Sequence, residues 1–275
     1  LGGGESGVGT AILGKQKGYE VFVSDKGQIS KKYKDVLINN DIDFEENQHT
    51  ESEILNADVV MKSPGIPDKV ALVKKLIQNS IPVISEMEFA VPFTNANIIG
   101  ITGSNGKTTT TLLTHYILKN AGINIGVAGN IGDSFAKQVA ENDFKNYVLE
   151  ISSFQLDGVQ DFNPHIAMIT NISPDHLDRY NYKFENYIES KFKITKNQKA
   201  TDYLIYDADD EFINNWLIKN KTKAKLVPFS IKKQLEYGAC IKGQNISINI
   251  NKEEINIGIS TLSLKGKHNT KNAMA

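Results

Sequence analysis

Hydrophobic and polar residues follow two different periods along the N-terminal third of the chain. Short runs rich in β-branched residues alternate with longer stretches in which apolar residues recur every three or four positions. We predict strands from the runs and helices from the stretches, which together are typical of a parallel α/β sheet. The predicted strands are residues 19–24, 57–62 and 81–84, and the predicted helices lie near residues 8–17, 31–39 and 70–78.

A second α/β pattern follows a short break in this periodicity. Residues 91–97, which include Pro92 and several polar residues, indicate a linker. The predicted strands beyond it are residues 98–102, 125–128, 147–151, 166–170, 203–206 and 225–228, with a hairpin at 246–250 and 255–259. We therefore predict two α/β domains, over residues 1–93 and 94–275.

Length, charge and cysteine content limit the function. A chain of 275 residues is long enough for two domains that each bury a core. The net charge of −1 excludes a general attraction to nucleic acid or to an acidic membrane surface. No run approaches the roughly 18 apolar residues of a membrane span. The single cysteine, Cys240, excludes an internal disulfide and fits a cytoplasmic location.

A glycine-rich segment after the predicted strand 98–102 has the composition of a phosphate-binding loop. It reads Gly103-Ser104-Asn105-Gly106-Lys107-Thr108-Thr109 and leads into a predicted helix at residues 109–121. Glycines allow backbone N–H groups to turn towards a phosphate, and the helix N-terminus adds the positive end of its dipole. Lys107 is then expected to reach the terminal phosphates, and the Thr108 hydroxyl to bind Mg²⁺.

This loop departs from the usual phosphate-loop pattern in the place of its first glycine, and motifs elsewhere in the chain limit the class of nucleotide-binding protein. The first glycine is expected at position 101, which is Ile101, and stands instead at Gly103. The chain also has no Asp-x-x-Gly and no Asn-Lys-x-Asp motif, so a G protein is unsupported. Kinases, motor ATPases and ligases that form an acyl phosphate remain.

A second glycine turn, Gly2-x-Gly4-x-x-Gly7, opens the first predicted helix, and Asp25 ends the next predicted strand. By itself this is the fingerprint of a dinucleotide-binding fold, and it keeps an NAD-dependent oxidoreductase as an alternative. The fingerprint is weak, because the same turn can hold any diphosphate at a helix N-terminus. A nucleotide-binding regulatory module without catalysis is a second alternative.

Two residues after predicted strands of the second domain suit either catalysis or a plain surface role. Glu150 ends the strand 147–151, where α/β proteins place catalytic groups, although an exposed carboxylate is common there too. His176 follows the strand 166–170 and has Arg179, the only arginine of the chain, three positions further on. A lone histidine is more often structural, so its charged neighbours carry the catalytic interpretation.

Lys191 stands on the apolar face of the predicted helix 184–197, three and four residues from Ile188 and Tyr187. The plain interpretation is a lysine stem that runs past apolar surface to water. The alternative is a buried amine, whose pKa burial lowers.

Six segments together resemble the Mur ligase family. They are residues 63–66, 102–110, 129–132, 150–156, 171–180 and 268–272. The run Ser152-Ser153-Phe154-Gln155-Leu156 is similar to the branch of the family that adds D-glutamate to UDP-N-acetylmuramoyl-L-alanine. The resemblance implies a Rossmann-like N-terminal domain that binds the uridine nucleotide and a central P-loop ATPase-type α/β domain.

The resemblance also implies a reaction. ATP phosphorylates the alanine carboxylate, and the amine of D-glutamate attacks the acyl phosphate, giving a peptidoglycan precursor in the cytoplasm. Mg²⁺ ions, two of them by this resemblance, offset the like charges of the reacting groups. A monomer is expected. Because both chain ends resemble cuts, a third domain beyond residue 275 is expected to hold D-glutamate, and the fragment alone is expected to be a poor ligase.

Individual residues take roles from the resemblance. Those that hold ATP are the loop Gly103, Ser104, Asn105, Gly106, Lys107, Thr108 and Thr109, with Asn269 and Asn272 at the adenine. Those that hold Mg²⁺ are Thr108, Glu150, His176 and a carbamylated Lys191, and the catalytic set is Lys107, Glu150, His176 and Lys191. Those near the nucleotide substrate are Glu5, Ser6, Asp25, Lys26, Ser63, Asn130 and Gln155.

Overall fold

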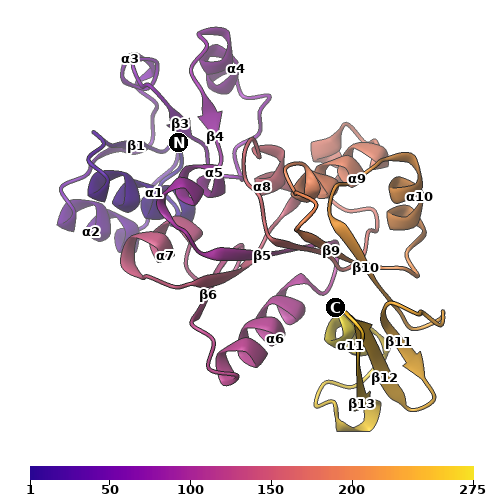
Figure 1. Ribbon diagram of the computed structural model, residues 1–275. Coiled ribbons are helices and arrows are strands. Elements are labelled where there is room, and N and C mark those ends of the chain that lie inside the picture. The colour runs from indigo at the N-terminus through magenta and orange to yellow at the C-terminus, as the bar shows by residue number, and fades with distance from the viewer. The chain divides into compact units, whose positions relative to one another are not determined.

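The computed structural model describes residues 1–275, which alternate between helices and strands (Figure 1). The chain forms two compact units. Unit 1 comprises residues 1–96, 128–145 and 154–162, and unit 2 comprises residues 97–127, 146–153 and 163–275. No helix is long and apolar enough to cross a membrane. The α/β class predicted from the sequence is confirmed.

Unit 1 contains two short parallel strand pairs covered by helices. The strands are β1 (Phe22–Ser24), β2 (Asp43–Glu45), β3 (Val60–Met61) and β4 (Val83–Ile84), and β1 pairs with β2 while β3 pairs with β4. The helices are α1 (Glu5–Gln16), α2 (Lys31–Asn39), α3 (Glu51–Ile54), α4 (Ala71–Gln78), α5 (Glu86–Ala90), α7 (Phe135–Glu141) and most of α8 (Ser153–Asp157), with a 3₁₀ turn at Val91–Phe93.

Helices α1 and α7 lie in close contact within unit 1. A Cβ added at Gly9 in α1 would overlap the Ser134 hydroxyl that precedes α7, so the glycine permits this approach. Residues of α1 also form an apolar core with Val23, Leu37 and Ile42, which come from the β1–β2 region. A second core beneath α4 contains Ile54, Val60, Leu72 and Leu76.

Unit 2 is built on a nine-stranded sheet in the order β13-β12-β11-β10-β9-β8-β5-β7-β6. Its strands are β5 (Asn97–Thr102), β6 (Ile125–Gly129, whose last two residues belong to unit 1), β7 (Asn146–Glu150), β8 (Ile166–Ile169), β9 (Tyr203–Asp207), β10 (Lys225–Ser230), β11 (Gly238–Lys242), β12 (Asn245–Ile250) and β13 (Glu253–Gly258). Strands β7, β5, β8, β9, β10 and β11 are paired in parallel, and β11, β12 and β13 are antiparallel.

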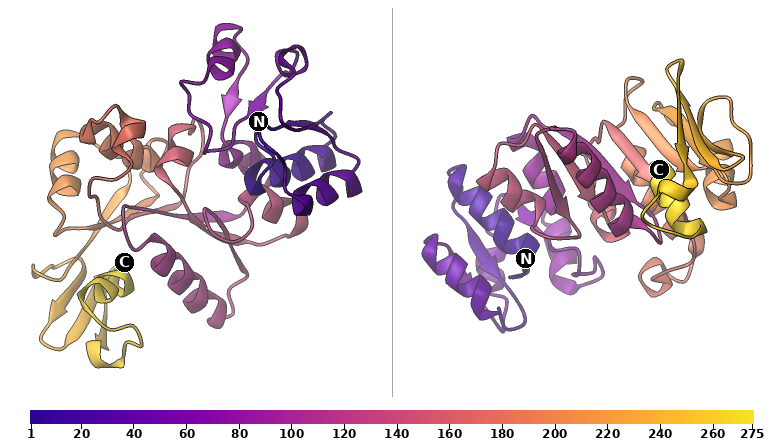
Figure 2. Two further views of the ribbon diagram at one scale, coloured as in Figure 1. Left: turned by 180° about the vertical axis from the view of Figure 1, so that it is seen from behind. Right: turned by 90° about the horizontal axis from the view of Figure 1, so that it is seen from below.

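The helices of unit 2 are α6 (Lys107–Asn120), α9 (Phe184–Phe192), α10 (Glu211–Lys219) and α11 (Lys267–Met274), with 3₁₀ turns at Leu177–Tyr180, Lys193–Thr195 and Ile259–Thr261. Both views of Figure 2 show α11 beside strands β11–β13 at the yellow end of the chain. The buried residues Phe229, Ala239, Ile246 and Met274 form one apolar cluster there.

The predicted elements agree with the structure in kind and differ at their ends. The hairpin expected at 246–250 and 255–259 is β12 and β13, and the helix expected over 184–197 ends at Phe192 before a 3₁₀ turn. Strand β2 escaped prediction because Asp43 and Glu45 leave one apolar residue in three. The chain passes between the units more than once, because residues 128–145 and 154–162 belong to unit 1. The nucleotide-binding and ATP-binding roles predicted for residues 1–93 and 94–275 remain predictions.

Candidate functional site

The glycine-rich loop of unit 2 connects the end of β5 to the start of α6, as predicted. Gly103 has φ +147° and Gly106 has φ +83°, a backbone region that disfavours side chains. A Cβ at Gly103 would overlap the Thr170 hydroxyl, and a Cβ at Gly106 would overlap Asn272 Oδ1. Glycine is therefore required at both positions, for conformation and for space.

The loop is held in place by residues that follow the neighbouring strand β8. The Asn105 N–H donates to Asn171 Oδ1 (2.9 Å), and the Thr170 hydroxyl donates to the Asn105 carbonyl (2.7 Å). The Ser104 hydroxyl donates to the Ser173 carbonyl (2.9 Å). Because these bonds come from outside the loop, its shape is set before any ligand arrives.

Lys107 folds back across this loop. Its ammonium donates to the carbonyls of Gly103 (3.0 Å) and Ser104 (2.9 Å). The positive charge is therefore held beside the backbone that the phosphate-loop prediction places around a phosphate.

The structure brings Thr108 and Glu150 together. Glu150 lies at the carboxyl end of β7 with 2% of its surface exposed, and its Oε2 accepts from the Thr108 hydroxyl at 2.7 Å. A hydroxyl and a carboxylate at a phosphate loop are oxygen ligands of the kind Mg²⁺ prefers. Mg²⁺ also keeps waters and phosphate oxygens in its coordination shell, so two protein oxygens are a sufficient protein contribution.

Lys191 is buried rather than extended to water, with 2% of its surface exposed. Its ammonium lies 3.3 Å from the Thr102 hydroxyl and 5.0 Å from the centre of the Tyr187 ring. Burial raises the pKa of Tyr187, whose hydroxyl lies 3.1 Å from that of Ser104 in the phosphate loop. The structure thus rejects the interpretation of Lys191 as a surface lysine and places it near the end of β5.

His176 is half-exposed and sits in a left-handed backbone conformation (φ 49°) before a 3₁₀ turn. Its Nε2 lies 3.5 Å from Asp175 Oδ2, and its carbonyl accepts from the Arg179 N–H. No three His, Cys, Asp or Glu side chains cluster as metal ligands. The predicted set of Thr108, Glu150, His176 and Lys191 contains only two such residues, so it depends on the modified lysine and on phosphate oxygens.

Helix α11 brings Asn272 to the phosphate loop, with its Oδ1 against Gly106. The other predicted adenine contact, Asn269, lies one turn earlier and donates from Nδ2 to the Lys265 carbonyl at 2.9 Å. This proximity could not be read from the sequence, since Gly106 and Asn272 are far apart along the chain.

In unit 1 the glycine turn before α1 is closed by Asp25. The Asp25 carboxylate accepts from the N–H groups of Gly3 (2.6 Å) and Gly27 (2.7 Å). Ser63 lies against Gly2, whose added Cβ would overlap the serine hydroxyl. Asp25 and Ser63 are therefore gathered at the turn, as a substrate site requires.

The remaining predicted substrate residues are distributed over unit 1. Glu5 accepts from the Ser134 N–H (3.2 Å) and the Tyr33 hydroxyl (2.9 Å), and the Ser6 carbonyl accepts from Thr10. Lys26 and Asn130 are exposed. Their proposed contacts with a nucleotide remain predictions.

One cluster beside the turn was missed in the sequence. The Ser24 hydroxyl donates to Glu45 Oε1 (2.7 Å) and lies 2.6 Å from His49 Nδ1. Burial works against ionisation of Glu45, but hydrogen bonds from Ser24, Thr50 and Gln48 outweigh it and lower the pKa of Glu45 to about 2. Burial lowers the pKa of His49. Nothing in the sequence indicated this cluster, because strand β2, whose last residue is Glu45, was not predicted.

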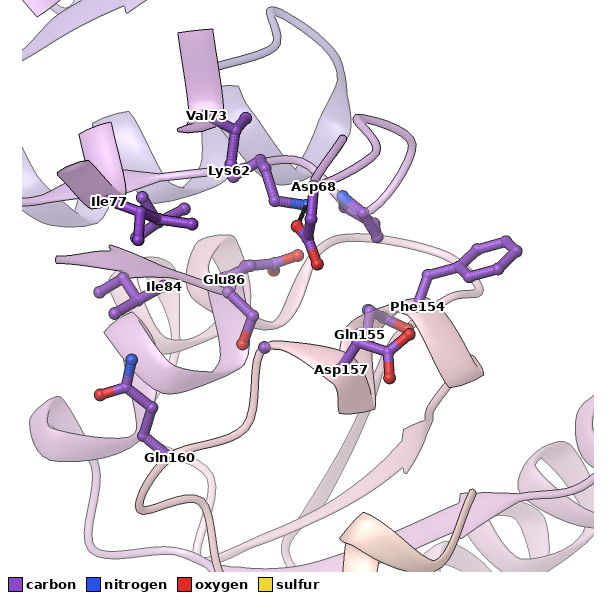
Figure 3. A pocket seen from close by; sticks show the side chains of 14 residues that line it. Lys62, Asp68, Val73, Ile77, Ile84, Glu86, Phe154, Gln155, Asp157 and Gln160 are labelled. Atoms are coloured by element: carbon purple, nitrogen blue, oxygen red, sulfur yellow. Dashed lines mark ion pairs between the residues drawn. The ribbon is translucent and has the colours of Figure 1, made fainter. Parts of the chain in front are cut away.

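A pocket of about 290 Å³ opens in unit 1, and Gln155 is the predicted substrate residue that lines it. In Figure 3, Val73, Ile77 and Ile84 gather on one side, with Gln155 and Asp157 on the other. Lys62 and Asp68 form an ion pair there at 3.1 Å. Burial raises the pKa of Glu86, a further lining residue, whose Oε1 accepts from the Ala136 N–H. No phosphate-loop residue lines this pocket.

Two family models match the chain. Residues 101–275 match the Mur ligase middle domain, and residues 4–72 match the MurD N-terminal domain. A UDP-N-acetylmuramoylalanine--D-glutamate ligase of Christiangramia forsetii is 58% identical over the whole chain, and one of Bacteroides thetaiotaomicron is 50% identical. The chain spans 62% of the length of each relative.

Solved structures share the fold at low identity. A UDP-N-acetylmuramate:L-alanyl-gamma-D-glutamyl-meso-diaminopimelate ligase from Neisseria meningitides superposes with a TM-score of 0.65 at 18% identity, over 97% of this chain and 87% of that one. A UDP-N-acetylmuramate-alanine ligase from Thermotoga maritima gives a TM-score of 0.57 at 20% identity, over 98% of this chain and 62% of that one. At this identity the likeness concerns the fold alone.

Proposed function

Because the chain belongs to the Mur ligase family, we propose that this protein uses ATP to join D-glutamate to UDP-N-acetylmuramoyl-L-alanine in peptidoglycan precursor synthesis. The structural observation that carries the proposal is the contact between Thr108 and buried Glu150 at the phosphate loop. A dehydrogenase needs neither group. The relatives of Christiangramia forsetii and Bacteroides thetaiotaomicron both carry the name of this ligase.

The proposed roles in unit 2 follow from where its side chains lie. Lys107 and the loop N–H groups hold the phosphates of ATP, and Asn269 and Asn272 contact the adenine. Thr108 and Glu150, with His176 and modified Lys191, hold Mg²⁺, which supplies charge compensation between the triphosphate and the substrate carboxylate. The terminal phosphoryl group passes to the alanine carboxylate, and phosphate leaves when the amine of D-glutamate attacks.

The proposed roles in unit 1 concern the uridine nucleotide. The turn from Gly2 to Gly7 offers backbone N–H groups at the start of α1, where a diphosphate is favoured. Asp25 and Ser63 already contact this turn. Lys26, Glu5, Ser6, Asn130 and Gln155 complete the proposed substrate set, and the proposed location of the reaction is the cytoplasm.

Calorimetry on this chain tests the proposal most directly. We expect UDP-N-acetylmuramoyl-L-alanine to bind and NAD⁺ to give no heat. The variant Gly7→Ala should lose the uridine nucleotide and keep ATP, because its Cβ would overlap the Gly2 carbonyl and distort the turn. Gly18→Ala, just beyond the other end of α1, is the control, because nothing lies within 4 Å of its added Cβ, although Gly18 has a positive φ (+83°) that Gly7 lacks. Binding of NAD⁺ with no response to the uridine nucleotide would refute the proposal.

We further propose that Lys191 carries a carbamate. Its burial beside Thr102 supports this, since burial disfavours the charged ammonium and favours the neutral amine that reacts with carbon dioxide. Carbon-13 NMR in labelled bicarbonate should show one carbamate carbon, which disappears in Lys191→Arg. Lys196→Arg, at an exposed position five residues later, should keep the signal. A wild-type spectrum without this signal at saturating bicarbonate would mean plain lysine.

A further inference from the structure

Helix α11 is tied to the central sheet of unit 2 by a lysine between two buried carboxylates. The Lys271 ammonium lies 2.5 Å from Asp207 Oδ2 and 3.5 Å from Asp209 Oδ2. The side chains of Asp207 and Asp209 are 3% and 0% exposed, and that of Lys271 is 24% exposed. An ion pair this enclosed is far less screened by solvent than a surface pair.

Both carboxylates are fixed by the ends of parallel strands. Asp207 is the last residue of β9, and its Oδ1 accepts from the Asp209 N–H at 2.9 Å. Asp209 accepts from the Ser230 hydroxyl (2.5 Å) and the Ile231 N–H (2.9 Å), where β10 ends. The positions of the two carboxylates are therefore fixed by the sheet and do not depend on where α11 lies.

The same helix carries the asparagines that face the nucleotide in the proposed function. Asn272 follows Lys271 directly and rests against Gly106 of the phosphate loop. Met274, one turn after Lys271, is buried with Phe229 and Ile246. An apolar contact tolerates sliding and rotation of a helix, whereas a short ion pair to fixed carboxylates sets both.

We propose that Lys271, held by Asp207 and Asp209, is a positioning residue that fixes the rotation of α11 and thereby aims Asn269 and Asn272 at the base of ATP. This inference rests on the proposed function, because it requires ATP at the phosphate loop. It assigns to Lys271 no contact with ATP itself.

The test compares ATP with inorganic tripolyphosphate, which has the phosphates and no base. Both are titrated into the whole chain and into Lys271→Met, Lys271→Arg and Lys267→Met. Lys267 is an exposed lysine of the same helix, so its variant makes the same change of charge outside the ion pair.

We expect Lys271→Met to weaken ATP by at least roughly tenfold, in line with the loss of a charge-assisted bond. Tripolyphosphate should bind equally well to all four proteins. Lys271→Arg should recover most of the affinity for ATP, because it restores the charge opposite Asp207. Lys267→Met should match the wild type for both ligands.

Three results would overturn the inference. Equal weakening of tripolyphosphate and ATP in Lys271→Met would mean that the lysine acts by its charge on the phosphates. Unchanged ATP affinity would mean that the ion pair does not position the helix. If the wild-type chain binds ATP no more tightly than tripolyphosphate, the adenine base makes no contact that Lys271 could position. If the wild-type chain binds neither ligand, the proposed function itself is refuted.

Folding of each variant is checked by the emission of Trp216, the single tryptophan, which lies in α10 of unit 2. If Lys271→Met does not fold, Asp207→Asn decides the question, since it keeps the shape of the side chain and removes the charge. It is then expected to weaken ATP and to spare tripolyphosphate, and equal effects on both ligands would reject the positioning role.

Discussion

At the scale of single residues, two kinds of contact shape the proposed sites: glycines at positions where a side chain would clash, and carboxylates held in place by hydrogen bonds. Gly106 is the clearest case, because its φ is +83° and its missing Cβ leaves the space that Asn272 Oδ1 occupies. Asp25 is a second, since its carboxylate closes the glycine turn of unit 1. Substituting either residue is therefore expected to change the shape of the phosphate loop or of the glycine turn, even where the residue itself does not contact a ligand.

The variant Gly106→Ala is expected to bind ATP at least roughly tenfold more weakly, since the side chain of Asn272 must swing away from its place. The positive φ adds about 1 kcal/mol of strain. Gly122→Ala, just beyond the end of α6, is the matched control, because Gly122 has φ +78° and nothing within 4 Å of the added Cβ.

Calorimetric titration with ATP measures the affinities of both variants, and urea unfolding measures their stability. Gly122→Ala should lose a similar amount of stability and keep its affinity for ATP. Equal ATP affinity in the two variants would contradict the role given to the contact between Gly106 and Asn272.

At the scale of elements, the N-terminal cap of helix α10 also holds a neighbouring loop. Asp210 precedes α10 and accepts from the N–H groups of Phe212 (2.9 Å) and Ile213 (3.1 Å). Its other oxygen accepts from the N–H of buried Ile172 at 2.7 Å. One carboxylate thus caps a helix and holds the segment after β8, which also anchors the phosphate loop.

Asp210→Ala should lower the free energy of unfolding of unit 2 by roughly 2 kcal/mol or more, since it removes a cap and leaves a buried N–H unpaired. Asp210→Asn should lose less, because the amide oxygen can still cap the helix. Trp216 reports the transition in urea, since its ring stacks on Phe192 at 3.7 Å.

The control for this series is Lys183→Ala. Lys183 precedes α9 in the same way and makes no capping bond with its side chain, so a change within about 0.5 kcal/mol is expected. A loss in Asp210→Ala no larger than that of the control would show that the cap does not stabilise unit 2.

At the scale of the whole molecule, strand order assembles the proposed ATP site. Strand β5 lies between β7 and β8, all three parallel, so their carboxyl ends meet at one edge of the sheet. The phosphate loop, Glu150 and the segment 170–173 come from these three ends. This is the edge at which α/β proteins place ligands. The addition of β9 and β10 brings Asp207 and Asp209 to the same edge.

Much of this site was accessible from the sequence because its signals are local. The phosphate loop is a contiguous run between a strand and a helix, and Glu150 was placed correctly because its strand has a clear apolar run. The apolar face that carries Lys191 is also a property of one helix, but it left open whether the ammonium reaches water or is buried. The roles of these residues toward ATP and Mg²⁺ remain proposals.

The sequence by itself determined the α/β class, the phosphate loop and the family, because periodicity, glycine spacing and ordered motifs are contained in short stretches of chain. Only the tertiary structure decided that Lys191 is buried against Thr102, that Asn272 meets Gly106, and that Lys271 binds Asp207. Each of these contacts joins residues far apart in the chain. Their meeting depends on the order of strands in the sheet, which apolar periodicity does not encode.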